Sequence, residues 1–342
     1  MKKLLKSLML IALVFSLAAC GNGKTGEGEE TNGASDNVTV YSPHPSETLN
    51  LVVKEFEEKT KIKVDVVAAG TGELLKRVES ESANPLGDVF WGGGAESLES
   101  FKEYFEPYKS PELEFIDAAY YADDFTWTGG SPLPMVLMYN TNLIDEANEP
   151  KAWIDLLKPE FKGQIAMADP AKSGSAYTIL VTMIQAYGKD DGKGWEFASD
   201  FYDAIEGKIL GSSTAVYKGV ADGEYLVGLT LEKEAQPYVL SGAPVKIIYP
   251  EDGTSAVPDG QAIIKGAKNM ENAKKFIDFV LSKETQQIMS DQLSRRSIRS
   301  DATPPEGLGG LDTIKIIDYN FDWAANEKTA ILDQWKEIVI GN

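Results

Sequence analysis

From residue 38 onward the sequence alternates short β-branched runs with amphipathic runs, and this alternation limits the fold more than any other feature. Residues 38–41, 62–67 and 88–91 have the length and composition of buried strands. The run between the first two has one apolar helical face, made by Leu49, Val52, Val53 and Phe56. Strand, helix and strand in this order require right-handed crossovers, so the pattern predicts an α/β fold with parallel strands.

A second series of the same kind follows. Its strand-like runs cover residues 134–139, 165–168, 208–211, 225–231, 245–249 and 261–264. Further helices are expected over residues 272–281 and in a tail that ends near Ile340. A chain of 342 residues is long for one core and favours two domains.

We therefore expect two α/β lobes joined by two crossings, near residues 131–138 and 254–260, which together make a hinge. Lobe 1 would hold residues 38–133 plus 257–342, and lobe 2 would hold residues 134–256.

The first residues have the three-part layout of an export signal. Three lysines precede an apolar run over residues 8–15, which is too short for a stable membrane anchor. The order Leu17-Ala-Ala-Cys20 looks like a bacterial lipobox, in which cleavage leaves a lipid-modified Cys20 at the new N-terminus. The alternative is a plain secretory signal with an incidental cysteine. Residues 1–19 are thus predicted to be a signal peptide, and residues 20–37, rich in Gly, Glu, Asn and Thr, a flexible tether.

Charge and cysteine content restrict the function classes. The net charge is −20, and removing residues 1–19 removes three lysines and no acid, which takes it to −23. Nucleic-acid binding needs a basic face and is disfavoured. Cys20 is the only cysteine, so the fold has no internal disulfide and depends on its core.

Four loops that follow predicted strands are rich in small residues, and each precedes a helix: GTG at 70–72, GGG at 92–94, SGSA at 173–176 and SST at 212–214. Loops at the carboxyl ends of parallel strands gather at one edge of a sheet, where ligands bind. Gly and Ser at a helix start expose N–H groups and the positive end of the helix dipole. The four loops indicate a shared cradle for a phosphate-sized anion, although each could also be only a helix cap.

Ser175 could instead be a nucleophile, because it lies in a Gly-rich turn before a helix. The sequence Ser173-Gly-Ser175-Ala lacks the G-x-S-x-G spacing of a nucleophile elbow. The only histidine, His44, is distant in sequence, and no hydrolase framework accompanies it. We therefore expect Ser175 to donate a hydrogen bond, and we expect no enzymatic activity.

Other residues are candidates for the ligand's remaining contacts. Ser42 and His44 lie in the first loop, and Trp91, at a strand end, is either core or an apolar wall. Asp169 is a turn cap or accepts hydroxyl groups, and Glu232 follows the strand at 225–231. Asp252 and Asp259 are expected in turns, while Arg295 and Arg296 contact the anion or form structural salt bridges.

The chain resembles a known family over residues 38–342. The segments that carry the resemblance are VTVYSPHPSE, AAGTGELLKRVESE, PLGDVFWGGG, LMYNTNLI, GQIAMADPAKSGSAY, VGLTLEKEA, AVPDGQAIIKGAKN and LSRRSIRSD. They are similar to the solute-binding proteins of ABC importers with the type II periplasmic-binding-protein fold, in the branch that holds ferric-ion-, phosphonate- and hexose-phosphate-binding proteins. The resemblance implies an extracytoplasmic protein that captures a solute between two lobes by hinge closure and delivers it to a membrane permease.

The resemblance leaves the ligand open. The ferric relatives usually present two adjacent tyrosines late in the second lobe, whereas the only Tyr-Tyr here is Tyr120-Tyr121, and Tyr238 stands alone. We expect a small phosphate-bearing organic anion, with ferric ion as the alternative, no cofactor, no metal site and a monomeric chain. The expected ligand-binding residues are Ser42, His44, Thr71, Gly72, Trp91, Gly93, Asp169, Ser173, Gly174, Ser175, Ala176, Ser212, Ser213 and Glu232.

Overall fold

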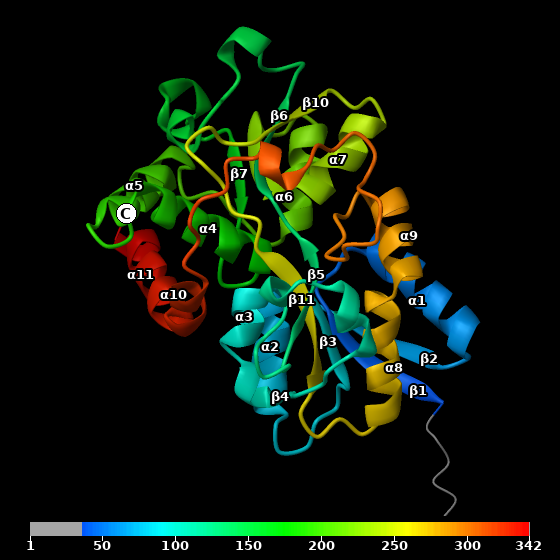
Figure 1. Cartoon of the computed structure of the whole chain (residues 1–342). Coiled ribbons are helices and arrows are strands. Elements are labelled where there is room, and N and C mark those ends of the chain that lie inside the picture. The colour runs from blue at the N-terminus through cyan, green and yellow to red at the C-terminus, as the bar shows by residue number, and fades with distance from the viewer. Residues whose placement is uncertain (1–35, 342) are drawn as a thin grey trace, which may run out of the picture. The chain divides into compact units, whose positions relative to one another are not determined.

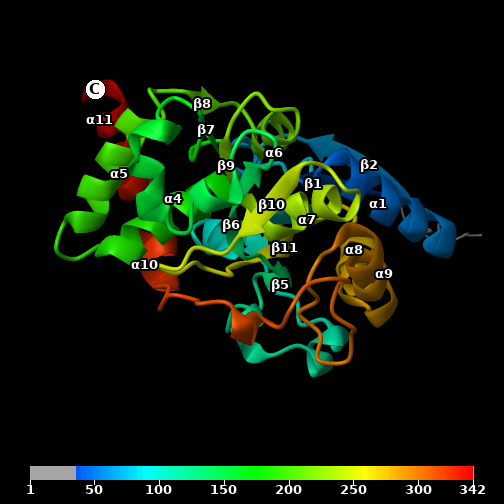
Figure 2. The same ribbon diagram turned by 90° about the horizontal axis from the view of Figure 1, so that it is seen from above.

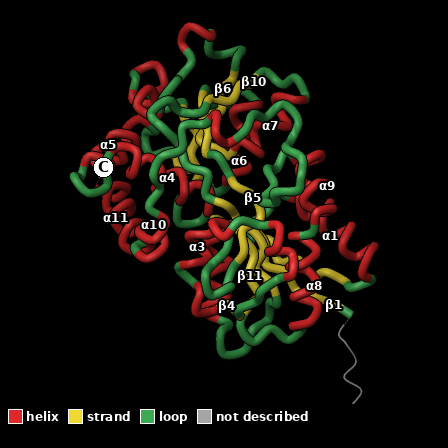
Figure 3. The backbone as a smooth tube through the Cα atoms, viewed as in Figure 1, coloured by secondary structure: helices red, strands yellow, loops and turns green. Residues whose placement is uncertain are grey.

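A computed structural model describes residues 36–341 of the chain. The predicted signal peptide, Cys20 and nearly all of the predicted tether lie outside the described residues. Within residues 36–341, no helix has the length and hydropathy needed to cross a membrane. The described part is one compact unit built on two β-sheets (Figures 1 and 3).

The first sheet has the strand order β2-β1-β3-β11-β4, with β5 also paired to β11. Its strands are β1 (Asn37–Ser42), β2 (Lys63–Ala68), β3 (Val89–Gly94), β4 (Phe105–Glu106), β5 (Thr128–Pro132) and β11 (Pro258–Ile264). Strand β1 pairs in parallel with β2 and β3, as predicted, whereas β11 is antiparallel to its neighbours. The part of the chain built on this sheet is lobe 1.

The second sheet has the order β10-β6-β9-β7-β8 and forms the centre of lobe 2. Its strands are β6 (Met135–Asn140), β7 (Ile165–Ala168), β8 (Ile209–Leu210), β9 (Val227–Leu231) and β10 (Val245–Ile248). Strand β7 pairs in parallel with β8 and β9, while β6 runs antiparallel to β9 and β10. Every residue of β6, β7 and β9 is buried, because the sheet is covered on both faces.

Helices cover the two sheets (Figure 2). They are α1 (Ser46–Thr60), α2 (Thr71–Ser80), α3 (Ala95–Glu99), α4 (Gly174–Tyr187), α5 (Lys193–Ala204), α6 (Ser213–Ala221), α7 (Glu232–Leu240), α8 (Met270–Leu281), α9 (Lys283–Leu293), α10 (Phe321–Asn326) and α11 (Lys328–Gly341). In α1 three residues of the predicted apolar face, Leu49, Val52 and Phe56, are buried, while Val53 is partly exposed. The helix ends where Lys61 adopts the left-handed conformation at φ 63°. The sequence pattern therefore selects both the helix and the face that packs.

The chain crosses between the sheets from β5 to β6 and again between β10 and β11. The two-lobed α/β architecture is confirmed, and both predicted crossings are present.

The predicted assignment of residues 257–342 to lobe 1 needs a correction. After α9 the chain crosses a third time, and Ala324, Ile331 and Trp335 join the apolar core that also holds α4 and α5. Figures 1 and 2 both show α11 beside α5. The reason is burial: Trp335 is 3 % exposed in the core of lobe 2, where its ring packs edge-on against the Tyr202 ring with the ring centres 5.8 Å apart.

Candidate functional site

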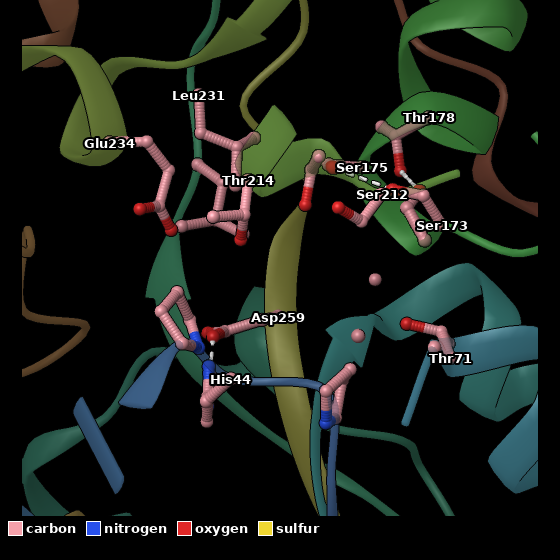
Figure 4. Close-up of a pocket in the computed structure, with 18 of the residues that line it drawn as sticks. His44, Thr71, Ser173, Ser175, Thr178, Ser212, Thr214, Leu231, Glu234 and Asp259 are labelled. Carbon is pink, nitrogen blue, oxygen red and sulfur yellow. Dashed lines mark hydrogen bonds and ion pairs between the residues drawn. The ribbon is translucent and has the colours of Figure 1, made fainter. Parts of the chain in front are cut away.

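A cavity of about 370 Å³ lies where the carboxyl ends of β1, β3, β7 and β9 meet (Figure 4). Lobe 1 contributes the loop of Pro43 to Pro45, the start of α2 and the end of β3. Lobe 2 contributes the starts of α4, α6 and α7. The volume falls in the range of small-molecule sites.

Three of the helices that begin at this cavity, α2, α4 and α6, come from both lobes. Gly70, Ser173 and Ser212 occupy their cap positions. The Ser173 hydroxyl accepts the Ala176 N–H at 3.3 Å, and the Ser212 hydroxyl accepts the Ala215 N–H at 3.4 Å. Each cap satisfies only one first-turn donor, so the earlier N–H groups of α4 and α6 stay available to an anion.

All four predicted small-residue loops reach the cavity. The predicted site residues that line it are His44, Thr71, Gly93, Ser173, Gly174, Ser175, Ser212 and Ser213. Two features favour glycine at position 93. Its φ is +79°, which other residues rarely adopt, and a Cβ there would lie 2.7 Å from the Thr71 methyl group.

Ser42 and Trp91 do not line the cavity, and the structure corrects both expectations. Ser42 is fully buried; its hydroxyl donates to the Trp91 carbonyl at 2.6 Å and accepts the His44 N–H at 3.3 Å. The Trp91 ring is 2 % exposed and packs edge-on against the rings of His44 and Phe276, at 4.5 and 5.5 Å. Both residues support the His44 loop from the core side.

Gly72, Asp169 and Ala176 are also outside the cavity lining. The Gly72 N–H donates to the Lys172 carbonyl at 3.4 Å, which joins the two lobes beside the cavity. The Asp169 carboxylate accepts the Ala171 N–H at 2.9 Å and so caps a turn, and the Ala176 N–H is taken by Ser173. Their hydrogen bonds are therefore made within the protein.

Glu232 is the clearest departure from the prediction. Its carboxylate accepts two hydrogen bonds from the Arg296 guanidinium, at 2.7 and 2.9 Å, and one from the Tyr249 hydroxyl. Arg296 also donates to the Gly309 carbonyl at 2.7 Å. Arg296 thus follows the structural alternative, a buried ion pair between the lobes. Asp252, expected in a turn, accepts from the Trp153 N–H at 3.1 Å and from the Tyr187 hydroxyl.

The charged end of the cavity was missed from the sequence. Lys233 and Glu234, which pair with each other, line it together with Asp259. Asp259 lies in β11 rather than in a turn and pairs with Arg295 at 2.5 Å. Lys233 and Glu234 could have been predicted to line the cavity, because they directly follow a strand that ends at the cleft. Thr214, in the SST loop, also lines the cavity.

His44 and Asp259 present buried atoms that nothing in the described part of the chain satisfies. His44 Nε2 and Asp259 Oδ1 have no hydrogen-bond partner, although His44 Nε2 lies 3.7 Å from Asp259 Oδ2. Burial lowers the pKa of His44 well below its usual range, and the nearby Arg295 and Lys233 charges lower it further. A neutral imidazole and a carboxylate can both exchange hydrogen bonds with a ligand's hydroxyl or amine groups.

The described part of the chain can be compared with what a metal site or a serine nucleophile would require. Among residues 36–341, no group of three His, Cys, Asp or Glu side chains is placed to hold a metal, and no described residue that lines the cavity is a tyrosine. The Ser175 hydroxyl lies 3.0 Å from the Ser173 hydroxyl, and no hydrogen bond in the described part joins either serine to His44.

Comparisons with known proteins agree with this architecture. Residues 84–306 match the family of bacterial extracellular solute-binding proteins. The chain is 27% identical to a putative 2-aminoethylphosphonate-binding periplasmic protein of Salmonella paratyphi A, over 83% of this chain and 85% of that one. It is also 27% identical to iron uptake protein A1 of Synechocystis, over 80% and 79% of the two chains.

A solved structure with a similar fold is the periplasmic binding protein AfuA of Actinobacillus pleuropneumoniae with fructose-6-phosphate bound. The TM-score is 0.84 at 26% identity, over 89% of this chain and 98% of that one. With most of its length matched by the family model and its fold shared with a solved periplasmic binding protein, the chain belongs to the bacterial extracellular solute-binding proteins, the solute-capturing components of ABC importers.

Proposed function

We propose that the chain captures a small organic phosphate or phosphonate in the cavity between its lobes and delivers it to an ABC permease. The observation that carries the proposal is the convergence of the N-termini of α2, α4 and α6 on one cavity. A phosphate group has three acceptor oxygens, and first-turn N–H groups with the aligned helix dipoles supply donors without a compensating cation.

The rest of the ligand would lie against the charged end. In Figure 4 Glu234, Thr214, Asp259 and His44 surround one side of the cavity, and Thr71, Ser173, Ser175 and Ser212 the other. The carboxylates of Glu234 and Asp259 are acceptors for hydroxyl or ammonium groups. This division fits a sugar phosphate or an aminoalkyl phosphonate, the ligand types named for two of the similar proteins.

The protein's charge of −20 makes short-range donors necessary for such a ligand. The overall field repels an anion, so binding depends on groups in direct contact with it. The proposal also includes an N-terminal lipid on Cys20, which holds the monomeric protein on the outer face of the cell membrane. The lobes close over the bound ligand.

The first experiment is calorimetric titration with fructose-6-phosphate and 2-aminoethylphosphonate, each compared with fructose or ethanolamine. Binding of a phosphorus-bearing compound and none of its counterpart is expected. Equal binding of both members of a pair, or no binding across a broad panel of organophosphates, contradicts the proposal. A coloured complex with ferric ion would support the iron alternative instead.

A pair of substitutions at Ser213 tests whether the backbone N–H of this residue donates a hydrogen bond to the ligand. Ser213 is the first residue of α6, where proline fits helical geometry but has no N–H. Ser213→Pro should weaken binding by about 10- to 100-fold, the loss expected for one hydrogen bond to a charged group. The matched variant Ser213→Ala keeps the N–H and should lose much less. Equal losses in the two variants would show that the backbone donor is not used.

A further inference from the structure

Two ion pairs account for the charges at the charged end of the cavity. Lys233 and Glu234 both line the cavity and bond to each other, and their side chains are 8 % and 13 % exposed. The Asp259 carboxylate accepts from the Arg295 guanidinium at 2.5 Å, and these side chains are 4 % and 3 % exposed. Because each pair is largely shielded from water, its two charges act mainly on each other. Each pair is neutral as a unit.

The other titratable side chains that line the cavity, within residues 36–341, are Lys172 and His44, and neither adds an unpaired charge. The exposed Lys172 ammonium lies 3.3 Å from the Asp169 carboxylate. The His44 imidazole is buried, which lowers its pKa well below the usual range and keeps it neutral. The positive potential that remains for a ligand therefore comes from the N-termini of α2, α4 and α6.

The apolar part of the wall makes a second charge on the ligand unfavourable. It consists of Leu133, Met135, Leu231 and Val257. A charged group that leaves water for such a wall loses its hydration and needs an opposite charge in return. A hydroxyl group needs only a donor and an acceptor. Thr214 offers both, because its Oγ1 accepts from the Tyr217 hydroxyl at 3.3 Å and its own proton can be donated to a ligand.

We propose that the pairs Lys233–Glu234 and Asp259–Arg295 make the cavity selective for a ligand with one anionic group and an uncharged, hydroxyl-bearing body. This chemistry is that of a sugar or polyol phosphate, and it excludes an aminoalkyl phosphonate. The inference rests on the proposed function and narrows it. A paired carboxylate still has lone pairs for a hydroxyl, whereas a ligand ammonium must compete with Lys233 for Glu234, and a ligand carboxylate must compete with Glu234 for Lys233.

The experiment is calorimetric titration with matched pairs of phosphorus compounds that differ by one charge on the body. Glucose-6-phosphate is compared with glucosamine-6-phosphate, which has an ammonium in place of one hydroxyl. Sorbitol-6-phosphate is compared with 6-phosphogluconate, which has a carboxylate in place of one hydroxymethyl group. The smaller pair is 2-hydroxyethylphosphonate and 2-aminoethylphosphonate. The wild type should bind the uncharged-body member of each pair at least about tenfold more tightly.

Two single variants should shift this selectivity in opposite directions. Lys233→Met leaves Glu234 unpaired and should raise the affinity for the ammonium compounds, relative to their uncharged partners, by about 10- to 100-fold. Glu234→Gln leaves Lys233 unpaired and should raise the relative affinity for 6-phosphogluconate by a similar factor. The double variant has neither charge and should keep the preference of the wild type. A side chain that only maintains the fold would not exchange one preference for the other.

Matched controls and distinct outcomes complete the test. Lys54→Met and Glu58→Gln make the same substitutions in an exposed pair on α1 and should leave the selectivity unchanged, and thermal unfolding shows that each variant is folded. If no phosphorus compound binds, the proposed function itself fails. Charged members bound as tightly as their partners by the wild type, or ratios that the two single variants do not shift in opposite directions, would overturn only the selectivity. An equal loss of every compound in Lys233→Met would place Lys233 at the phosphorus group and also overturn it.

Discussion

The buried ion pair between Glu232 and Arg296 allows a quantitative prediction for Arg296→Met. Their side chains are 1 % and 8 % exposed, and the substitution removes three hydrogen bonds, two to the carboxylate and one to the Gly309 carbonyl. Tyr249 alone would remain against a buried charge. Loss of one partner of such a pair costs about 3–5 kcal/mol of unfolding free energy, because the remaining charge is uncompensated.

The cost converts to a measurable change in melting temperature. An unfolding entropy of about 2 cal/mol/K per residue gives about 0.6 kcal/mol/K for a domain of ~300 residues. Arg296→Met should therefore melt about 5–8 °C below the wild type in differential scanning calorimetry. Since Glu232 begins α7 in lobe 2 and Arg296 follows α9 in lobe 1, the variant should also have a smaller closed fraction.

Two further variants of the protein complete this test. The double variant Glu232→Gln/Arg296→Met removes both charges and should recover part of the loss, because no buried carboxylate is left unpaired. Lys54→Met, at a side chain that is 69 % exposed, should change stability by less than about 0.5 kcal/mol. The reasoning is refuted if Arg296→Met melts within about 2 °C of the wild type, or if the double variant is less stable than the single one.

Two other predictions follow from the packing. In Gly72→Ala the new methyl group would overlap the Ala171 carbonyl oxygen, so the lobes cannot approach fully. Affinity for a bound phosphate compound should fall about tenfold or more, and unchanged affinity in calorimetry would contradict this. Trp335→Ala should lower the unfolding free energy in urea by about 3–5 kcal/mol, because the ring fills the core of lobe 2; a loss below about 1 kcal/mol would mean that α11 is not part of that core.

Much of the fold was predictable because its signals are local. The run predicted at 165–168 is β7 (Ile165–Ala168), and that at 62–67 is β2 (Lys63–Ala68), shifted by one residue. The place of the C-terminal helices was not predictable in the same way. The apolar residues of α11 indicate that it packs, but not which lobe has space for Trp335.

Some residues of the site were also predictable from the sequence, and others were not. Parallel strands place the residues that follow them at one edge, so Thr71, Ser173 and Ser212 could be assigned to a common cavity from the order of the sequence alone. The amino-acid sequence by itself therefore determined which helix N-termini line the cavity, and the proposed anion site rests on them.

Which carboxylate lies at the charged end of the cavity depends on the residue at which helix α7 begins. Helix α7 starts at Glu232, and two residues along a helix turn a side chain by about 200°. Glu232 consequently faces Arg296 in the interior, and Glu234 faces the cavity. Both are glutamates beside a strand end, and the sequence does not distinguish them. Only the tertiary structure decided which carboxylate lines the cavity, because the choice depends on which face of helix α7 is turned toward the cavity.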